Sequence, residues 1–525
     1  DMYAQAYFEY DSKKSFGVTK SHLRLSKKPI RSTYYVKRAD FVACHNQSYV
    51  RQYDMVQEVK PGGTFLLNTS WTPEELDANL PGKMKRYIAQ NGIRLFTVDA
   101  VEVAQRLGSH INTVLQAAFF QIAGLMPVEE ALDYMKDAAR KSYARKGDAV
   151  VAKNVAAIEE GAQKCVKVAV PASWADAPLD ESATEANVPA VVENILRPVN
   201  AQKGDDLPVS AFAGYEDGVI DMGLTAYEKR GIAVKTPAWN AEACIQCNRC
   251  AFVCPHAVIR PYLLDQDEAQ NAPEGFTTIA LKGGKNLPEG TRYAIQVSQF
   301  DCTSCGSCAD VCPAGALDMQ PAKLTDQARK LWDFGLTISD KDGAFDPYTV
   351  KGSQFKQPLL EFSAACAGCG ETPYAKLLTQ LFGDRVYWAN ATGCSQAWGS
   401  PFPGIPYTVN KRGFGPAWTN SLFENNAELS LGLFLGSVQQ RAVEKARVEK
   451  LSRALTHGLE KPKADAGDTP DAAVMSVMKA ACEDYLAAFD DFDASRKAAD
   501  ALVACAQASM GKLTNSAQEV CDEVL

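Results

Sequence analysis

The sequence predicts a multidomain α/β protein with a smaller α+β domain near its centre. The chain has 525 residues, a length that suggests about three or four domains. Short apolar runs alternate with helical periods over residues 1–160, which is typical of a parallel sheet covered by helices. Two cysteine quartets of identical spacing lie between residues 244 and 312, and they place the α+β domain at residues 241–325.

Composition and charge exclude several classes of protein. A hydrophobic content of 46% is sufficient for packed cores, and the formal net charge of −8 predicts no nucleic-acid partner. The absence of an apolar run of about 18 residues, and of a signal peptide, predicts no membrane association. Eight of the 16 cysteines fall in the quartets and are expected to be thiolates, which indicates a reducing compartment. Because the chain begins at Asp1, we expect it to be a portion of a longer protein.

Residues 1–160 are predicted to form a doubly wound α/β domain. The candidate strands are short runs bounded by turn residues: Ala4–Tyr10, Ser32–Val36, Phe41–Cys44, Thr64–Asn68 and Leu95–Val98. The candidate helices include Pro73–Leu80, Met84–Gln90 and Asn112–Leu125. In folds of this kind, ligands gather where the parallel strands end.

Three loops at candidate strand or helix ends were considered as binding sites. Residues 11–17 offer two lysines, two serines and a glycine, which suits a phosphate group, although a solvated basic turn is the more common structure for such a sequence. His45 follows another strand and is expected to be structural. Asn112 is expected to be the N-cap of the helix that it opens.

Residues 161–240 are predicted to be an extended linker domain. Prolines occur about every ten residues, and acidic and alanine-rich stretches lie between them. We expect one short helix near Val188–Ile195, and a course over other domains without a core of its own.

Each cysteine quartet reads Cys-x2-Cys-x2-Cys-x3-Cys-Pro, the spacing of a bacterial-type run that binds [4Fe–4S] clusters. The short gaps let one loop reach three corners of a cube, while the fourth cysteine ligates the neighbouring cluster. We therefore predict a ferredoxin-like domain with two clusters. One cluster is assigned to Cys244, Cys247, Cys250 and Cys312, and the other to Cys302, Cys305, Cys308 and Cys254.

A pair of structural zinc sites is the alternative, because zinc also takes four cysteines in two CxxC pairs. Zinc does not need the third and fourth cysteines of each run or the following proline, so the doubled pattern favours clusters. Between the quartets, residues 276–300 are expected to form an inserted hairpin. Five apolar residues are expected to shield the clusters from water: Ile245, Val253, Ile259, Phe300 and Val311.

Residues 326–525 contain a third cysteine site and a helical region. Cys366 and Cys369 are followed 25 residues later by Cys394, and such a set of three can hold zinc or an iron–sulfur cluster. Glu371 adjoins this set. It either contacts a cofactor or complements a helix dipole as a first-turn carboxylate. Beyond residue 430 we expect about three or four amphipathic helices, with a break at Lys461–Asp471. Three further cysteines are expected on their apolar faces as core residues: Cys482, Cys505 and Cys521.

Several longer segments carry a family resemblance. They are Tyr10-Asp11-Ser12-Lys13-Lys14-Ser15 with Ser21-His22-Leu23-Arg24, Ala39–Asn46, Asn200–Asp205, Cys244-Ile245-Gln246-Cys247-Asn248, Cys366–Tyr374 and Asn390–Cys394. With these segments the chain resembles pyruvate:ferredoxin (flavodoxin) oxidoreductase over essentially its whole length, as the central portion of that enzyme.

The resemblance implies an oxidoreductase of the EC 1.2.7 type. Such an enzyme oxidatively decarboxylates pyruvate on thiamine diphosphate, transfers the acetyl group to coenzyme A and releases CO2. Its electrons pass through three [4Fe–4S] clusters to ferredoxin or flavodoxin. The third cluster would be held by Cys366, Cys369 and Cys394, with a fourth ligand beyond this chain.

The resemblance also implies cofactor contacts. Glu371 and Cys394 match positions that contact thiamine diphosphate, so residues 326–525 would form part of an α/β thiamine-binding domain with a helical insertion. Ser15, Asn112 and Asn154 match coenzyme A contacts in the α/β domain, and a further coenzyme A loop of the family would precede Asp1.

This sequence departs from the family pattern. Phe16 stands where the family usually has glycine, which narrows the phosphate loop. The Gly-Asp-Gly…Asn motif for Mg²⁺ and diphosphate is not found, and neither is the pyruvate-binding domain, so the Mg²⁺ ligands would lie outside this chain. The chain alone is therefore expected to be inactive. The resemblance implies a homodimer, in the cytoplasm of an anaerobe or alternatively in a mitochondrion or hydrogenosome of a protist.

Three other functions were weighed. The same core fused to a flavoprotein reductase would be a pyruvate:NADP oxidoreductase, and this sequence does not decide between the acceptors. A non-catalytic two-cluster electron carrier would explain the quartets but not Glu371 or the α/β domain. A zinc-stapled scaffold would need neither Glu371 nor the α/β domain, and iron and sulfide analysis separates it from the other functions.

Overall fold

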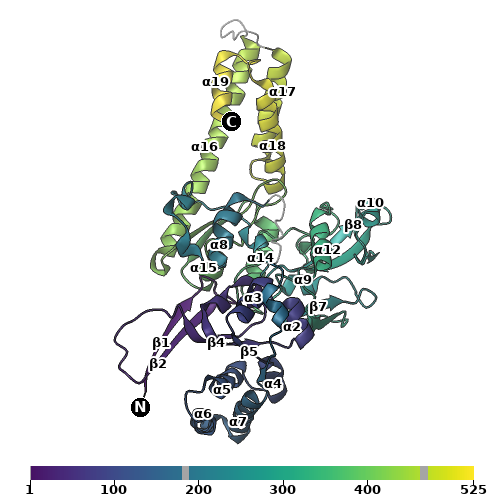
Figure 1. The fold of residues 1–525 in the computed structure, drawn as a ribbon. Coiled ribbons are helices and arrows are strands. Elements are labelled where there is room, and N and C mark those ends of the chain that lie inside the picture. Colours follow the sequence, from purple (N-terminus) through teal and green to yellow (C-terminus); the bar gives the residue numbers. More distant parts are fainter. Residues whose placement is uncertain (1, 180–187, 462–470, 525) are drawn as a thin grey trace. The chain divides into compact units, whose positions relative to one another are not determined.

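The computed structural model describes residues 2–179, 188–461 and 471–524. The chain folds into two compact units (Figure 1). Unit 1 comprises residues 1–386 and 393–417, and unit 2 comprises residues 387–392 and 418–525. All three cysteine sites belong to unit 1.

A four-stranded sheet with the order β3-β4-β5-β6 organises the first part of unit 1. Its strands are β3 (Ala39–Cys44), β4 (Val59–Asn68), β5 (Arg94–Val98) and β6 (Val166–Lys167). The first three pair in parallel, and β6 joins the edge in the antiparallel direction. The predicted strands at Phe41–Cys44, Thr64–Asn68 and Leu95–Val98 are confirmed.

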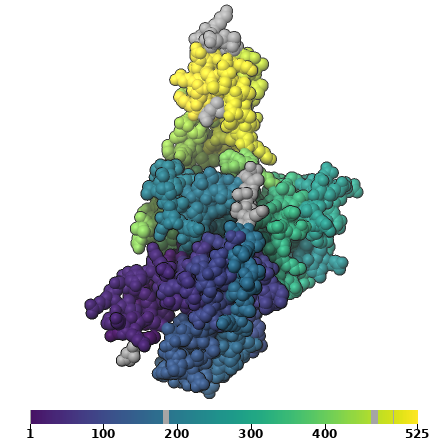
Figure 2. All heavy atoms as spheres, viewed as in Figure 1, coloured from purple at the N-terminus to yellow at the C-terminus, as the bar shows by residue number. Residues whose placement is uncertain are grey.

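Helices cover both faces of this sheet because alternate residues of β4 point to opposite sides. Phe65 and Leu67 pack against α2 (Pro73–Asn79) and α3 (Gly82–Gln90). Leu66 packs on the other face, against helices that gather at the bottom of Figure 1 and in the blue lobe of Figure 2. Those helices are α4 (Ala100–Leu107), α5 (Ile111–Ala123), α6 (Val128–Tyr143) and α7 (Asp148–Gln163), with α6 in a second layer.

The phosphate loop, residues 11–17, does not lie at the end of a parallel strand. It joins β1 (Tyr3–Tyr10) to β2 (Thr19–Ser26) in a separate antiparallel hairpin. β2 was not predicted, and the predicted strand Ser32–Val36 is wrong. That segment follows β2 through side-chain contacts instead of a ladder: His22 Nδ1 lies 3.1 Å from the N–H of Val36, and Arg24 stacks on the Tyr34 ring.

The predicted N-cap at Asn112 is also wrong. The residue that precedes α5 is His110, and Asn112 lies inside the first turn, where its Oδ1 accepts from the N–H of Thr113 at 3.0 Å.

The connector has a small core, contrary to the prediction that it would have none. A π-helical turn at Val192–Leu196 continues into α8 (Arg197–Asn200), close to the predicted helix. Its apolar side packs with Leu224 in a buried cluster. The prolines therefore punctuate a folded segment of short helices, and apolar residues between them supply the core.

The cysteine quartets lie in two matching strand–loop–helix–strand segments. The first contains β7 (Lys235–Trp239), α9 (Arg249–Val253) and β8 (Ile259–Leu264), and the second contains β10 (Arg292–Val297), α11 (Ser307–Asp310) and β11 (Leu317–Pro321). β7 pairs with β11 and β8 pairs with β10, both antiparallel, so the segments are intertwined. The predicted hairpin is confirmed, because β9 (Ile279–Ala280) pairs with the other edge of β10. Two short helices follow at α10 (Gln266–Gln270) and α12 (Asp326–Thr337).

The last part of unit 1 carries the third cysteine site. Its helices are α13 (Val350–Ser353), α14 (Thr372–Phe382) and α15 (Cys394–Gly399). Cys366 and Cys369 lie just before α14, and Cys394 is the first residue of α15.

Unit 2 contains the strand pair β12 (Tyr387–Ala391) and β13 (Ala417–Ser421), and four helices. These are α16 (Asn426–Glu460), α17 (Ala472–Ala488), α18 (Phe492–Ser509) and α19 (Asn515–Val524). The helices are confirmed, and Cys482, Cys505 and Cys521 pack in their core. The predicted break at Lys461–Asp471 lies largely outside the described residues. No helix in the described ranges is long and apolar enough to cross a membrane.

Candidate iron–sulfur and cofactor site

The two quartet loops have the same backbone conformation. Position three of each run is left-handed, at Gln246 and Ser304, both with φ of 60°. The residue after the second cysteine is left-handed as well, at Asn248 (φ 59°) and Gly306 (φ 80°). Because left-handed residues turn successive N–H groups toward one side, these loops form concave cradles for anionic sulfur. The N–H of Gln246 points to Cys244 Sγ at 3.4 Å, and that of Ser304 points to Cys302 Sγ at 3.4 Å.

The cysteines group across the two quartets. Cys244, Cys247, Cys250 and Cys312 line one cavity together with Trp239 and Tyr293. In the second group, Cys302 interacts electrostatically with Cys254 and Cys305, and Cys308 interacts with these three cysteines and also with Cys250 of the first group. The last cysteine of each run therefore lies with the first three of the other run. This grouping supports the exchanged fourth ligands, which remain a prediction.

The surroundings suit [4Fe–4S] clusters. Cys250 and Cys302 are almost fully buried, and burial raises the pKa of each thiol to about 12. A buried thiolate needs a compensating cation, and cluster iron supplies it. Ile259 is buried in the same core as predicted. Ile245 is not: half of its side chain is exposed, because the loop turns it outward. Among the described residues, no three His, Cys, Asp or Glu side chains are arranged to hold a single metal ion.

The third cysteine site is more open. Cys366 and Cys394 are exposed, and Cys369 is half-buried. Cys366 Sγ accepts hydrogen bonds from Ser15 Oγ at 3.1 Å and from Lys14 Nζ at 3.4 Å. These two donors lower the pKa of the Cys366 thiol. Lys14 also interacts electrostatically with Cys394, so the phosphate loop brings the cysteines of two helices together.

Glu371 joins the two helices of this site. It immediately precedes α14, yet its side chain makes no capping hydrogen bond there. Its Oε2 instead accepts from the indole N–H of buried Trp398 on α15, at 3.1 Å. The side chain of Glu371 is thus oriented by a contact outside its own helix, which the dipole interpretation does not require.

The third cysteine loop lies against the second quartet. A Cβ at Gly368 would be 3.7 Å from the Cβ of Cys305. On the other side, the N–H of Phe362 donates to the carbonyl of His256, at 2.9 Å, and the ring of His256 contacts the carbonyl of Ser363 at 3.1 Å. His256 follows Cys254 by two residues. The cysteine group that contains Cys254 and Cys305 is therefore the neighbour of the third site.

Two connector residues that the sequence analysis missed hold this junction. Glu228 forms a buried ion pair with Lys13, and Arg230 donates to the carbonyls of Ser15 and Ser363. Lys13 is thereby committed to Glu228 and is not free for a phosphate group, unlike Lys14. The only signal for these two residues in the sequence is that they belong to a short charged run, Glu228-Lys229-Arg230, near the end of the connector.

The predicted coenzyme A residues are not brought into contact with one another. Ser15 contacts Cys366, Ala364 and Arg230. Asn112 is exposed, while Asn154 is only 4% exposed on the packed face of α7, with Nδ2 on the carbonyl of Val150. The Oδ1 of Asn154 is buried and has no hydrogen-bond partner among the described residues.

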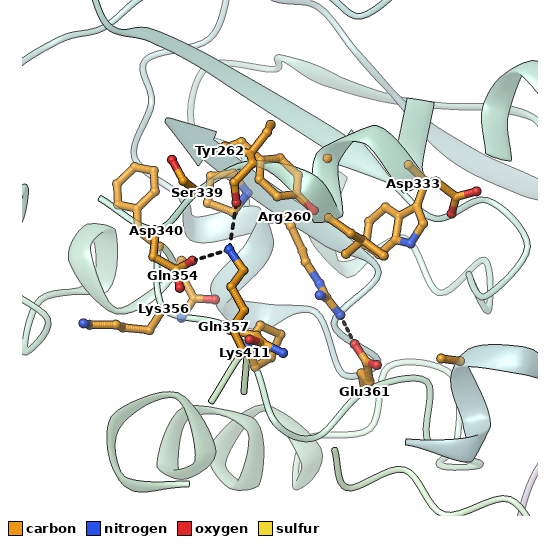
Figure 3. Close-up of a pocket in the computed structure, with 18 of the residues that line it drawn as sticks. Arg260, Tyr262, Asp333, Ser339, Asp340, Gln354, Lys356, Gln357, Glu361 and Lys411 are labelled. Carbon is orange, nitrogen blue, oxygen red and sulfur yellow. Dashed lines mark hydrogen bonds and ion pairs between the residues drawn. The ribbon is translucent and has the colours of Figure 1, made fainter. Parts of the chain in front are cut away.

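A cavity that is larger than the one lined by the first cysteine group lies elsewhere in unit 1. Its volume is about 660 Å³, and it lies between β8, α12 and residues 354–362. Figure 3 shows two pairs of oppositely charged side chains that face one another, Arg260 with Glu361 and Lys411 with Asp340, while Asp333 and Lys356 point away from these pairs. No cluster cysteine lines it, and we assign it no site.

Three known families each match a different part of this chain. Residues 1–164 match the family described as Pyruvate ferredoxin/flavodoxin oxidoreductase, and residues 243–317 match the 4Fe-4S dicluster domain. Residues 179–233 match a family described as a domain of unknown function. Together with the quartet geometry, the dicluster match defines an iron–sulfur protein of the oxidoreductase class and supports the [4Fe–4S] prediction.

The similar curated proteins are longer than this chain. Pyruvate:ferredoxin oxidoreductase of Moorella thermoacetica is 49% identical over 530 residues, covering 100% of this chain and 43% of that protein. Pyruvate-flavodoxin oxidoreductase of Enterobacter agglomerans is 48% identical, covering 95% of this chain and 41% of that protein. Pyruvate dehydrogenase [NADP(+)] of Cryptosporidium parvum is 45% identical, covering 84% of this chain and 24% of that protein. The chain belongs to the pyruvate:ferredoxin/flavodoxin oxidoreductase family and spans about two fifths of the length of the first two relatives.

Proposed function

We propose that this chain is the central portion of an enzyme that oxidises pyruvate to acetyl-coenzyme A and CO2 and passes the electrons to ferredoxin or flavodoxin. The observation that carries the proposal is the junction at Gly368, where the third cysteine loop meets the Cys305 loop. It gives electrons a continuous route from an open, cofactor-accessible site into a buried pair of cluster sites. A pure electron carrier would not need the open site.

In this proposal, the chain's residues arrange a relay. Cys366, Cys369 and Cys394 hold the entry cluster, with a fourth ligand from a segment outside this chain. Cys254, Cys302, Cys305 and Cys308 hold the next cluster, and Cys244, Cys247, Cys250 and Cys312 hold the last. Burial and the backbone N–H groups on sulfur tune the potentials of the two quartet clusters.

Glu371 is proposed to bind thiamine diphosphate, which when bound supplies the carbon nucleophile for pyruvate. The Mg²⁺ ligands would come from outside this chain. The N–H of Trp398 fixes one carboxylate oxygen of Glu371 and leaves the other available to the aminopyrimidine ring. Because Glu371 follows Cys369 by two residues, a ring held there would also be close to the entry cluster.

Coenzyme A is proposed to bind at the phosphate loop, where Lys14 and Ser15 supply an ammonium and a hydroxyl. Asn112 and Asn154 are proposed as further contacts on α5 and α7. For Asn154, contact requires local opening, because its amide is buried. Coenzyme A affinity of the full-length enzyme should fall in an Asn112→Ala plus Asn154→Ala variant, and unchanged affinity would remove these two residues from the site.

The test of the proposed function uses the full-length enzyme with Cys366→Ser. Pyruvate with coenzyme A should no longer reduce the two quartet clusters, as seen by EPR after rapid freezing, whereas dithionite should still reduce them. Cys165→Ser, outside all three sites, is the matched control and should behave as the wild type. Pyruvate-dependent reduction of the quartet clusters at the normal rate in Cys366→Ser would refute the relay.

The electron acceptor has two candidates. The Moorella and Enterobacter relatives are named for ferredoxin and flavodoxin, and the Cryptosporidium relative is named for NADP⁺. We propose ferredoxin or flavodoxin, with a homodimeric enzyme in the cytoplasm of an anaerobe. Acceptor-dependent pyruvate oxidation by the full-length enzyme decides between the two, because only a fused flavoprotein domain would support direct NADP⁺ reduction.

A further inference from the structure

A lysine on α14 lies buried between the third cysteine site and the quartets. The side chain of Lys376 is only 2% exposed, and its Nζ contacts three backbone carbonyls of the other segment. These belong to Ala251, Phe252 at 3.2 Å and Cys254 at 3.1 Å. The carbonyls lie at the end of α9, which carries Cys250, and at the cysteine that follows it.

The three contacts identify Lys376 as a cation. A protonated lysine has three N–H donors, which matches the three carbonyl acceptors, whereas a neutral amine has only two. Among the described residues, Lys376 has no carboxylate within ion-pair distance. Cys254 and Cys250 are the negative groups with which it interacts, and the nearby cation Arg260 is itself paired with Glu361. Since a buried charge needs a counter-charge, the cluster thiolates are its partners.

We infer that Lys376 is a positioning residue for electron transfer, which fixes the Cys254 loop and, by its charge, raises the reduction potential of the cluster that Cys254 ligates. A buried cation beside an anionic cluster stabilises the reduced form, which carries one more negative charge, and low local dielectric strengthens that effect. Nothing in the spacing of the cysteines assigns this role.

Its place on α14 connects the charge to the relay. The helix begins at Thr372, directly after Glu371, and Lys376 lies about 7 Å further along the helix axis at a rise of about 1.5 Å per residue. One rigid helix therefore has the open site at its first turn and the counter-charge of the next cluster in its second. The link between the two sites rests on the proposed function, but the effect of Lys376 on the reduction potential does not depend on pyruvate chemistry.

The test is a redox titration of the full-length enzyme, followed by EPR, in Lys376→Gln, Lys376→Met and Lys376→Arg variants. The two neutral variants should lower the potential of the Cys254 cluster more than that of the Cys244 cluster, and Lys376→Arg should remain near the wild type. Lys351→Gln is the matched control. Lys351 lies near Cys244 and Cys247 and is much less buried, so its loss should move only the Cys244 cluster, and by less.

Each outcome decides the inference. Unchanged potentials in Lys376→Gln with both clusters present would overturn it, as would an Arg variant that behaves like the Gln variant. If the neutral variants lose clusters while Lys376→Arg keeps them at the wild-type potential, the inference holds, because a positive charge at this position is then what the clusters require. A failed relay with intact Lys376 shifts would refute the proposed function alone.

Discussion

The quartets and the third cysteine site use the same ligand in opposite ways. Each quartet is completed within residues 235–321, by two interlocked repeats whose loops have matching backbone angles. Four of the eight quartet cysteines are less than a tenth exposed: Cys244, Cys250, Cys254 and Cys302. In the third site, Cys366 and Cys394 are exposed. Its cysteines come from the loop before α14 and from the first residue of α15, and Lys14 and Ser15, about 350 residues earlier, contact Cys366.

The difference separates conduction from access. A closed, buried site keeps water away and holds the potential steady, which suits electrons in transit. An open site that is completed by distant segments lets a substrate-bearing cofactor approach. Because its supports are the loop proposed for coenzyme A and the helix that begins after Glu371, the proposed function predicts that binding of either cofactor affects the entry cluster directly.

The largest expected effect comes from breaking the interlock. Cys312→Ser should remove the cluster of Cys244, Cys247 and Cys250 and leave the other cluster in place. About half of the quartet iron should be lost, or about four of about eight atoms per chain. Iron analysis and EPR check this, with Cys254→Ser as the reciprocal variant. Loss confined to the Cys302–Cys308 cluster in Cys312→Ser would show that the fourth ligands are not exchanged.

A large effect limited to the open site is expected from Glu371→Gln. If Glu371 holds thiamine diphosphate, cofactor affinity and pyruvate oxidation by the full-length enzyme should fall steeply while both quartet clusters remain. If it only complements the helix dipole, the change is a stability loss of about 1 kcal/mol or less. Calorimetric titration with thiamine diphosphate and pyruvate-dependent reduction are measured beside Glu242→Gln, an exposed carboxylate near the first quartet. Near-normal values for both would return Glu371 to a structural role.

A moderate effect should distinguish the two repeats from each other. Buried Asn248 donates to the carbonyl of Lys351 at 2.8 Å and accepts from the hydroxyl of buried Tyr293 at 2.7 Å, whereas a Cβ at the equivalent Gly306 meets nothing within 4 Å. Asn248→Gly should cost about 1–3 kcal/mol by leaving the Tyr293 hydroxyl unsatisfied. The reverse change, Gly306→Asn, should be nearly neutral, because asparagine tolerates a left-handed backbone. Thermal unfolding of the cluster-loaded chain measures both, and equal losses would contradict the hydrogen-bond account.

The smallest effect lies at the periphery of the closed domain. Burial opposes the charge of Glu268, but hydrogen bonds from Lys341 and Ser339 outweigh it and lower the pKa to about 2. Its stabilising contribution is therefore complete above the ordinary glutamate pKa of about 4.5 and disappears as the pH falls toward 2. Glu268→Gln should lower the free energy of unfolding at pH 7 by less than about 1 kcal/mol, because the pair is partly exposed, and the Tm should fall slightly. The gap between the variant and the wild type should be narrower at pH 3. A constant gap would rule out the ion pair as its source.

How much of this could be predicted depended on distance along the chain. The quartet spacing predicted the two-cluster domain and its hairpin, because the ligands of each loop lie within eleven residues. Helices and parallel strands followed from short-range periodicity. β2 and the segment after it were misjudged because His22 and Arg24, and not an apolar alternation, fix their contacts.

Long-range polar contacts could not be predicted. The buried pair of Lys13 with Glu228 and the contacts of Lys376 with the end of α9 join residues more than a hundred positions apart, and single lysines and glutamates carry no periodic signal. Asn112 and Asn154 could be named only through the family resemblance, and their role stays a prediction. The local patterns thus revealed the closed region and the cysteines of the open site, whereas the contacts of the open site with Lys14, Ser15 and Trp398 emerged only from the assembled fold.

The central claim, that the quartets are complete in themselves while the third site is not, is tested most directly on the 525-residue chain. The variant with Cys366→Ser, Cys369→Ser and Cys394→Ser is reconstituted anaerobically, desalted and analysed by iron, sulfide and EPR measurement. The account predicts about eight iron and eight sulfide per chain of the triple variant, in two interacting [4Fe–4S] clusters. The chain without these substitutions should reach the same values after brief exposure to air. Iron well below that value in the triple variant, or zinc in its place, would contradict the claim.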